Sequence, residues 1–282
     1  FDKRLKIVSA MIDDRVAKEN IPGYCLIILK DGKVCFQKPC GFADIAGSLP
    51  VTTDTVFGLA SLTKTFTATT LLSLVDKGLV NLDDPLSKYV DGLTDAYKPL
   101  TIRQLASMVA GVPSKVSEEV LWKDQLPILV NTPLVSQPGS EFLYSNFSYR
   151  LIGDVITKVT NRPFLDVVND TILGPLAMSS TATTVLLKPT GKVAQGYGDN
   201  NGQEPVHPIQ YKNPAVSFSA GMLASTGNDL TKYVQGLLSG QILSKQGYKT
   251  LWYERPALSS GKPCKWAFGW ASNLSSPNLG NQ

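Results

Sequence analysis

The sequence predicts a mixed α/β protein in which the two ends of the chain build one lobe and the middle builds a second, mainly helical lobe. Three observations predict this class. Two β-rich runs flank Asp31-Gly32, helical periodicity dominates from Ser61 to about Leu176, and a strand-like segment, KWAFGWAS, follows at 265–272. The expected lobes are an α/β lobe of residues 1–60 and 212–282, and a helical lobe of residues 61–211 that ends in an irregular excursion at 180–211.

An amphipathic helix opens the chain, because apolar residues recur at helical spacing at Leu5, Val8, Ile12 and Val16. A hairpin follows in GYCLIILKDGKVCFQKPCGFAD, since Asp-Gly between two β-rich runs is a strong turn signal. The middle of the chain predicts helices at 61–79, 101–109, 117–131, 146–160 and 163–173. Residues 180–215 are rich in Gly, Pro and Asn and are expected to be irregular, with two further helices at about 228–238 and 244–253.

Composition argues against several classes of function. The chain has 282 residues, of which 43% are hydrophobic and 18% charged, and this suits a globular protein with one large core or two lobes. No stretch approaches the ~20 apolar residues of a membrane span. The 27 basic and 23 acidic residues are spread along the chain without a basic run, so a nucleic-acid partner is not expected.

The chain begins at Phe1 rather than Met, which predicts that an N-terminal segment has been removed and that the mature protein is secreted or periplasmic.

Side chains that could bind a metal ion are scarce in this sequence. The single histidine is His207, and the cysteines lack paired C-x-x-C spacing, so no metal site is expected. The four cysteines are Cys25, Cys35, Cys40 and Cys264. Two alternatives are open for these residues. Some of them form a disulfide, or they are buried free thiols that act as small hydrophobic side chains.

The stretch FGLASLTKTFTATTLLSLVDKGLV, residues 57–80, places polar residues at the front of an apolar helical pattern. A serine hydroxyl becomes a nucleophile when a neighbouring base takes its proton. Positions i and i+3 share a helix face, so Lys64 can stand behind Ser61 as that base if burial or positive charge keeps the amine neutral. The spacing alone favours a helix-capping serine with a solvent-facing lysine. A second copy, Ser259 to Lys262, lies in a Gly/Pro loop with no helix to fix the pair.

Tyr144-Ser145-Asn146 is expected in a turn just before a helix. A phenol beside a nucleophile can relay protons, and an amide two residues further on can bind a substrate carbonyl. The alternative for Tyr144 is a half-buried ring whose hydroxyl is bonded locally. Another Y-x-N, Tyr211-Lys212-Asn213, is followed by Pro214 and no helix, so it is the weaker candidate.

Together these motifs resemble the serine β-lactamase and penicillin-binding-protein superfamily, specifically its class C β-lactamase-like branch with DD-peptidases and family VIII carboxylesterases. The resemblance covers about residues 20–270 and extends over the stretches VTTDTVFGLASLTKTFTATTLLSLVDKGLVNLDDPLSKYV, LTIRQLASMVAGVP and FSAGMLASTGNDLTKYVQGLL. It implies a β-lactamase/transpeptidase-like fold, in which an antiparallel sheet is flanked by helices and an all-helical lobe is inserted.

The resemblance also implies a chemistry. Ser61 would be the acylated nucleophile, Lys64 its proton acceptor, and Tyr144 the general base and acid that carries the proton to the leaving group. Asn146 would contact the substrate carbonyl, and the Ser61 N–H would supply one oxyanion-hole donor. The implied activity is a serine acyl hydrolase that forms an acyl-enzyme on an amide, ester or β-lactam. Its substrate would be a small molecule or peptide, and it would need no metal or cofactor.

The family's third element, K-[ST]-G or H-x-G on a core strand, is not found in this sequence. Lys30-Asp31-Gly32 is the predicted hairpin turn, Lys245-Gln246-Gly247 falls in a predicted helix, and His207 lacks the glycine. Only twelve residues follow Trp270, so the sheet is expected to be incomplete at the C-terminus. A chain that stops short is favoured over loss of this wall, which would expose an apolar face and an unpaired sheet edge. The alternative function is a non-catalytic relative that acts as a binding or scaffolding module.

Overall fold

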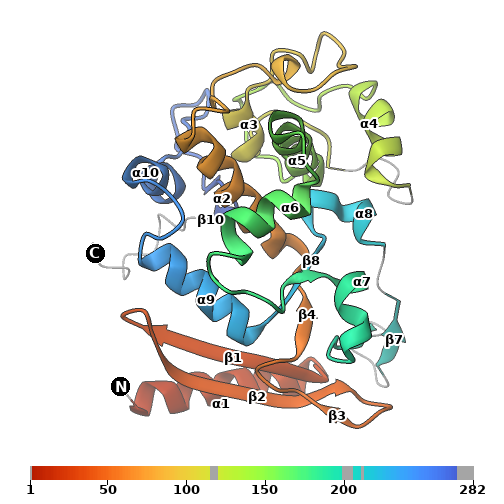
Figure 1. Cartoon of the computed structure of the whole chain (residues 1–282), viewed down its shortest axis with the longest axis vertical. Coiled ribbons are helices and arrows are strands. Elements are labelled where there is room, and N and C mark those ends of the chain that lie inside the picture. Colours follow the sequence, from red (N-terminus) through yellow and green to blue (C-terminus); the bar gives the residue numbers. More distant parts are fainter. Residues whose placement is uncertain (1, 115–119, 199–205, 211–212, 272–282) are drawn as a thin grey trace. The chain divides into compact units, whose positions relative to one another are not determined.

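The computed structural model of the chain describes residues 2–114, 120–198, 206–210 and 213–271 (Figure 1). The chain divides into two compact units. Unit 1 comprises Phe1–Gly58, Leu176–Asn213 and Leu223–Ser239, and unit 2 comprises Leu59–Pro175, Pro214–Met222 and Gly240–Gln282. The division differs from the expected lobes in three segments. Residues 176–211 are assigned to unit 1, and residues 214–222 and 240–282 are assigned to unit 2, where α10 packs on α2.

Unit 1 combines short antiparallel sheets with helices. Its strands are β1 Gly23–Lys30, β2 Lys33–Asp44, β3 Leu49–Pro50, β4 Val56–Gly58, β5 Ala182–Thr183, β6 Gly196–Gly198, β7 His207–Ile209 and β8 Leu223–Thr226. Its helices are α1 Asp2–Lys18, α7 Thr184–Leu187 with a 3-10 turn at Lys188–Thr190, and α9 Gly227–Leu238. The strands pair antiparallel in the orders β1-β2-β3, β4-β8-β5 and β6-β7, which confirms a mixed α/β class.

The N-terminal hairpin confirms the predicted turn. Asp31 and Gly32 have φ angles of +52° and +72°, and positive φ at both central positions is what a type I′ turn requires. Helix α1 is tied to this hairpin through Asp13, whose carboxylate accepts hydrogen bonds from Tyr24 Oη at 2.6 Å and from Lys38 Nζ at 2.5 Å. The opening helix and hairpin are therefore a connected part of unit 1.

The excursion at 180–215 holds more regular structure than the sequence predicts. β5 pairs Ala182 with Ala224 of β8, and the Thr183 side chain then caps α7 by accepting from the Leu186 N–H. β6 and β7 pair as a separate ribbon, with His207 in β7 rather than in a loop. The expectation of an irregular stretch was wrong for these segments, because strands of two or three residues are too short to leave a periodic pattern.

Unit 2 is mainly helical. Its helices are α2 Thr63–Asp76, α3 Ile102–Ala106, α4 Trp122–Val130, α5 Asn146–Thr160, α6 Phe164–Val168, α8 Pro214–Ser217 and α10 Lys245–Tyr253. Short 3-10 turns lie at Ala60–Leu62, Leu86–Lys88 and Phe218–Ala220, and a π turn follows α6 at Asn169–Leu173. The predicted bounds of 146–160 are confirmed. Helix α4 begins at Trp122, and the predicted helical residues 117–119 lie outside the described part of the chain.

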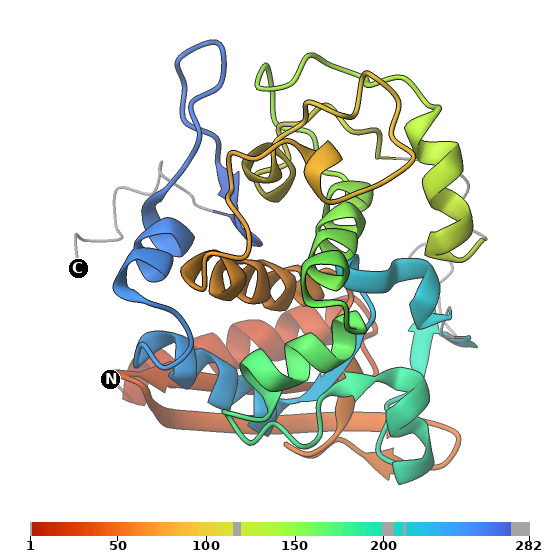
Figure 2. The same cartoon turned by 45° about the horizontal axis from the view of Figure 1, so that its top comes forward.

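Helix α2 is the central helix of unit 2. Its residues 63–74 are all buried, and α5, α6 and α10 contact it; Figures 1 and 2 both show α5 beside it. A helix buried around its whole circumference must be apolar or have its polar groups bonded. Thr65 and Thr67 meet this condition through backbone carbonyls, whereas Thr70 Oγ1 is buried without a hydrogen-bond partner among the described residues. Thr67 Oγ1, for example, donates to Ser219 O at 2.6 Å.

Both ends of α5 are capped. At the start, Ser145 Oγ accepts from the Ser148 N–H at 3.4 Å and donates to Pro113 O at 2.8 Å. At the end, Asn161 has φ +50°, the left-handed conformation that commonly terminates a helix. The N-cap at Ser145 fixes Asn146 as the first helical residue.

Residues 266–271 of the predicted strand KWAFGWAS form a tight hairpin rather than one strand. β9 Trp266–Ala267 pairs antiparallel with β10 Trp270–Ala271 around Phe268-Gly269, whose φ angles are +50° and +85°. The hairpin packs on α2, since a β-carbon at Gly269 would lie 2.8 Å from Lys64 O. The single-strand prediction was wrong because Phe-Gly is not among the strong sequence signals for this turn.

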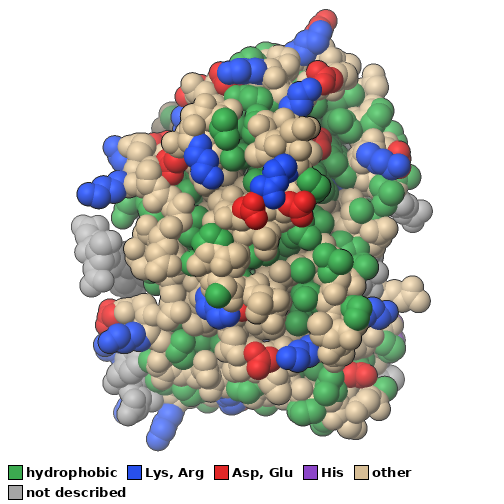
Figure 3. Space-filling view, viewed as in Figure 1, with side chains coloured by type: hydrophobic (Ala, Val, Ile, Leu, Met, Phe, Trp, Pro, Cys, Tyr) green, Lys and Arg blue, Asp and Glu red, His purple; other side chains and the backbone are tan. Residues whose placement is uncertain are grey.

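The four cysteines are free thiols, and of them Cys264 is buried whereas Cys25, Cys35 and Cys40 are half-buried, so the alternative of buried free thiols holds for Cys264. Within the described residues, no group of three or more His, Cys, Asp or Glu side chains is placed to hold a metal ion. None of the described helices has the length and apolar character needed to cross a membrane. On the face drawn in Figure 3, Lys and Arg side chains are interspersed with Asp and Glu side chains.

Candidate active site

Ser61 lies in the 3-10 turn Ala60–Leu62 that leads into α2. The preceding residue, Ala60, has φ +44°, a left-handed conformation that costs a non-glycine residue roughly 1–3 kcal/mol. Ser61 is exposed, whereas Lys64 is 0% exposed, and the N-cap of α2 is Leu62. The capping serine with a solvent-facing lysine, which the spacing alone favours, is therefore wrong.

Lys64 joins three elements through hydrogen bonds. Its Nζ lies 3.0 Å from Ser61 Oγ, 2.7 Å from Asn146 Oδ1 on α5 and 2.9 Å from Ala220 O in the turn Phe218–Ala220. An ammonium donates three protons, whereas a neutral amine donates two and keeps a lone pair. The Asn146 and Ala220 oxygens can only accept. They can take both protons of the neutral amine, and this leaves its lone pair facing Ser61.

The pKa of Lys64 is lowered to about 7, first by burial and second by the positive charge of Arg150. Burial disfavours the charged form because the ammonium loses its hydration, and a nearby cation repels it. A lysine with a pKa near 7 has a large neutral fraction at neutral pH. Lys64 thus meets the condition that a lysine base must satisfy.

Tyr144 Oη donates to Ser61 Oγ at 2.7 Å, so the serine oxygen lies within hydrogen-bond distance of both the phenol and the amine. The Tyr144 ring is 37% exposed and lies edge-on to Trp266 of β9, with 5.7 Å between ring centroids and 81° between planes. Phe142 extends this aromatic group, with its centroid 6.3 Å from that of Trp266. The Tyr144 hydroxyl is therefore directed to Ser61 and not to a local backbone partner.

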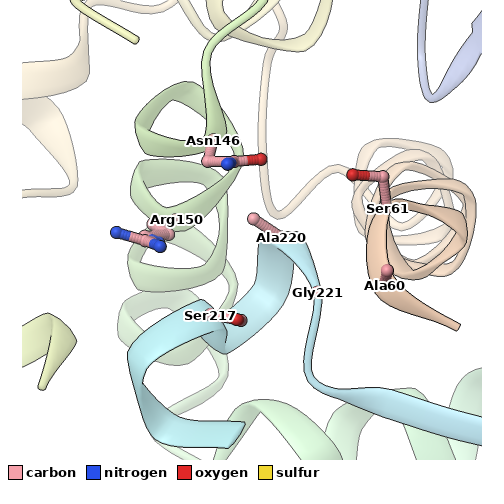
Figure 4. Close-up of a pocket in the computed structure, with 7 residues that line it drawn as sticks. All are labelled: Ala60, Ser61, Asn146, Arg150, Ser217, Ala220 and Gly221. Carbon is pink, nitrogen blue, oxygen red and sulfur yellow. The ribbon is translucent and has the colours of Figure 1, made fainter. Parts of the chain in front are cut away.

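Asn146 is placed by the cap of α5. Because its Oδ1 accepts from Lys64, its two Nδ2 protons are available on the other side of the amide. Figure 4 shows this side chain pointing toward Ser61. An amide in this position can both orient the lysine and donate to a carbonyl bound at Ser61.

A pocket of about 190 Å³ opens beside Ser61. It lies among the turn before α2, α5 and the segment 217–221, and small side chains make up most of its wall (Figure 4). Its lining residues are Ala60, Ser61, Asn146, Arg150, Ser217, Ala220 and Gly221. This pocket places open space directly next to the serine and the asparagine.

The structure brings the four predicted site residues together, and their hydrogen bonds link Ser61, Lys64, Tyr144 and Asn146. The second S-x-x-K copy lies in a turn closed by a bridge between Ala257 and Pro263. In the second Y-x-N copy, residues 211–212 lie outside the described part of the chain.

Three features of the site were not predicted from the sequence. Ala220 contributes a backbone oxygen, which no pattern of side chains reveals. Trp266 reaches Tyr144 from a distant segment. Arg150 could have been noticed, because it is a charged residue in the apolar helix NFSYRLIGDVI, four positions after Asn146.

Known proteins share this sequence pattern over most of the chain. A model of the beta-lactamase family matches residues 8–277. Protein flp of Staphylococcus aureus strain MW2 is 30% identical over 283 aligned positions, which cover 94% of this chain and 55% of that protein. The chain thus spans about half the length of the curated relatives it matches.

Solved structures share the fold. The octameric penicillin-binding protein homologue from Pyrococcus abyssi has a TM-score of 0.82 and 25% identity, over 94% of this chain and 64% of that chain. A beta-lactamase/D-alanine carboxypeptidase from Pseudomonas syringae has a TM-score of 0.75 and 25% identity, over 86% of this chain and 68% of that chain. The expected β-lactamase/transpeptidase-like fold is confirmed, and the chain belongs to the beta-lactamase family.

Proposed function

We propose that the protein is a serine acyl hydrolase that forms an acyl-enzyme on Ser61. The observation that carries the proposal is the position of Ser61 Oγ, 3.0 Å from Lys64 Nζ and 2.7 Å from Tyr144 Oη. A hydroxyl held between two groups that can exchange its proton is an activated nucleophile. Membership of the beta-lactamase family supports the same chemistry.

In the acylation step, Ser61 Oγ attacks the substrate carbonyl carbon while its proton passes to the neutral Lys64 amine. We expect the Ser61 N–H, at the approach to α2, to stabilise the resulting oxyanion. The bond to the leaving group then breaks, and Tyr144 gives its proton to the leaving oxygen or nitrogen. The Lys64 ammonium returns a proton to the Tyr144 phenolate. The products are a Ser61 ester and a neutral leaving group, with both proton carriers back in their starting forms.

In the deacylation step, water takes the place of the leaving group. One water proton passes to the neutral Lys64 amine as the oxygen attacks the acyl carbonyl carbon, and the Lys64 ammonium returns a proton to Ser61 Oγ as the ester bond breaks. Asn146 Nδ2 donates to a carbonyl of the bound acyl group in both steps. The substrate classes that fit this chemistry are esters, D-amino-acid amides or peptides, and β-lactams.

The test is intact-mass analysis after incubation with a short-chain ester, a D-Ala-D-Ala peptide and a penicillin. We expect a mass increase equal to one acyl group for at least one of them, located on the peptide that contains Ser61. The adduct should disappear in Ser61→Ala and persist in Ser259→Ala, the matched change in the second S-x-x-K copy.

A chain that forms no adduct with these substrates or with a serine-directed phosphonate would overturn the proposal. That result would favour the non-catalytic binding or scaffolding relative, for which the lack of a K-[ST]-G or H-x-G element in the sequence is the supporting observation.

A further inference from the structure

We propose that Arg150 is a positioning residue whose fixed positive charge keeps Lys64 in its neutral, proton-accepting form. The inference rests on the proposed function, because it concerns how the base of that reaction is prepared. It assigns a role to a residue outside the S-x-x-K and Y-x-N motifs.

Arg150 lies one helical turn after Asn146 on α5, so the two residues share a face of that helix. Asn146 is the side chain that accepts from Lys64 Nζ at 2.7 Å. Arg150 also lines the pocket that contains Ser61, and it is only 5% exposed. Because the guanidinium is buried, water screens its charge less than it screens the charge of an exposed arginine.

The guanidinium is held in place by neighbouring side chains. Arg150 Nη1 donates to Gln125 Oε1 on α4, and its guanidinium carbon lies 4.8 Å from the Phe147 ring centroid and 5.8 Å from that of Trp122. The Trp122 indole is anchored in turn, because its Nε1 donates to both carboxylate oxygens of Asp154 at 2.9 Å. The charge is therefore fixed relative to α5 and to Asn146.

Figure 4 shows the Arg150 side chain directed away from Ser61, whereas the Asn146 side chain points toward it. Arg150 is thus placed to act through its charge and not by contact with the reacting atoms. Two opposing influences act on the protonation state of Lys64. Its three acceptor partners favour the ammonium, and burial together with Arg150 favours the amine.

Other titratable groups lie around Lys64. The ring centroids of Tyr144 and Tyr149 are 5.0 Å and 5.9 Å from Lys64 Nζ, and burial raises the pKa of Tyr149, so this phenol is neutral at physiological pH. The turn Phe218–Ala220 presents the Ala220 carbonyl. The other helices and turns in contact with α2 carry the charged residues Asp166, Asp170, Lys245 and Lys249, and α5 itself also carries Asp154 and Lys158. Of the charges on these elements, that of Arg150 is the one that lowers the Lys64 pKa.

Asp154 requires a control of its own. Burial raises its pKa to about 7, the same range as that of Lys64, and its carboxylate contacts Trp122 beside Arg150. A pH profile with a midpoint near 7 could belong to either group. Asp154→Asn keeps an acceptor for the Trp122 N–H and removes this titration.

The first measurement needs no substrate. The protein is labelled with lysine carrying ¹³C at Cε, and the Lys64 signal, identified by its loss in Lys64→Met, is followed against pH by NMR. We expect Arg150→Met to move the titration midpoint upward by about one pH unit. Arg150→Lys, which keeps a cation, should retain most of the lowering. Asp154→Asn and Arg162→Met, the removal of an exposed arginine that pairs with Asp170, should leave the midpoint in place.

The second measurement is the pH dependence of Ser61 acylation with the best substrate of the mass assay. The acidic limb should shift with the NMR midpoint. The rate of Arg150→Met should fall about fivefold at pH 7 and approach that of the wild type at pH 9. If Arg150→Met does not fold, Arg150→Gln, which is neutral and can still donate to Gln125, replaces it in both measurements.

An unchanged Lys64 midpoint in the neutral variant would overturn the inference. An equal shift in Arg150→Lys and Arg150→Met would also overturn it, because the effect would then come from lost packing and not from lost charge. A failure of the proposed function is distinguishable, since it leaves the NMR titration measurable while no acyl-enzyme forms on Ser61.

Discussion

The hydroxyl of Tyr144 donates a 2.7 Å hydrogen bond to Oγ of Ser61. The two residues come from different segments, one from the loop before α5 and the other from the turn before α2. Their contact joins the two sequence motifs at a single oxygen. Because Lys64 reaches the same oxygen from the buried side, Ser61 Oγ has one hydrogen-bond partner that is partly exposed and one that is buried.

Tyr144→Phe removes the hydroxyl and keeps the ring against Trp266. We expect turnover of the acylating substrate to fall by about 10²–10⁴, because a positioned proton carrier contributes about that much. The free energy of unfolding should change by only about 1 kcal/mol, since one partly exposed hydrogen bond is lost. Stopped-flow acylation and steady-state turnover measure the first effect, and urea unfolding measures the second.

The matched control for this change is Tyr253→Phe, which removes a hydroxyl from a tyrosine that is 73% exposed. Turnover of this variant should equal that of the wild type. Full retention of turnover by Tyr144→Phe would assign the relay to water or to Lys64 alone.

Replacing Lys64 with methionine should change how the free energy of unfolding depends on pH. The pKa of Lys64 is about 7 in the folded protein, whereas a lysine in an unfolded chain has a pKa of about 10.4. Below pH 7 both states bind the proton and the full cost of burying the charge is present. Between these two values the unfolded chain binds the proton and the folded chain does not, so the free energy of unfolding of the wild type rises with pH.

Relative to Lys64→Met, the wild type should therefore gain roughly 1.4 kcal/mol per pH unit from about pH 7.5 to 10. Methionine is apolar and unbranched and suits the buried site. Urea unfolding of both proteins at several pH values measures the difference. Lys98→Met, at an exposed lysine that pairs with Asp95, should stay parallel to the wild type. Parallel curves for Lys64→Met would contradict the lowered pKa.

Features set by neighbouring residues could be predicted from the sequence. The Asp31-Gly32 turn and the bounds of α5 follow from local turn and capping chemistry, and the i, i+3 spacing correctly places Lys64 behind Ser61. The burial that lowers the pKa of Lys64 comes from helices packed around α2. From the sequence, burial of Lys64 could be named as a requirement for a neutral amine, but it could not be predicted that the fold buries this residue.

Features that depend on distant segments could not be predicted. The Ala220 carbonyl accepts from Lys64 only because the turn Phe218–Ala220 packs on α2. Two residues of β5 pair with β8, although they lie in a stretch whose composition predicts an irregular chain. Such contacts stabilise short elements through the fold as a whole, and local propensity carries little information about them.

The last prediction concerns Gly269, where the hairpin of β9 and β10 packs against the backbone of α2. A β-carbon at Gly269 would lie 2.8 Å from Lys64 O and 2.8 Å from Thr65 Cα, and φ at this position is +85°. The atoms it would meet are backbone atoms of a buried helix, which cannot move aside as a flexible side chain can. Gly269→Ala should therefore cost about 3 kcal/mol or more of unfolding free energy.

Gly261→Ala separates the two causes of this cost. Gly261 has φ +76°, and apart from Gly261 and its two chain neighbours no atom of the described residues lies within 4 Å of the position that a β-carbon would take there. Its change to alanine should therefore cost only the roughly 1–2 kcal/mol of the left-handed conformation. Urea unfolding of the two variants measures the difference, and a larger loss for Gly269→Ala confirms the close approach to Lys64. Gly269→Ala should also slow acylation, because the hairpin carries Trp266, which holds the Tyr144 ring. Equal losses in the two variants, with acylation unchanged, would mean that the hairpin can move off α2 without disturbing the site.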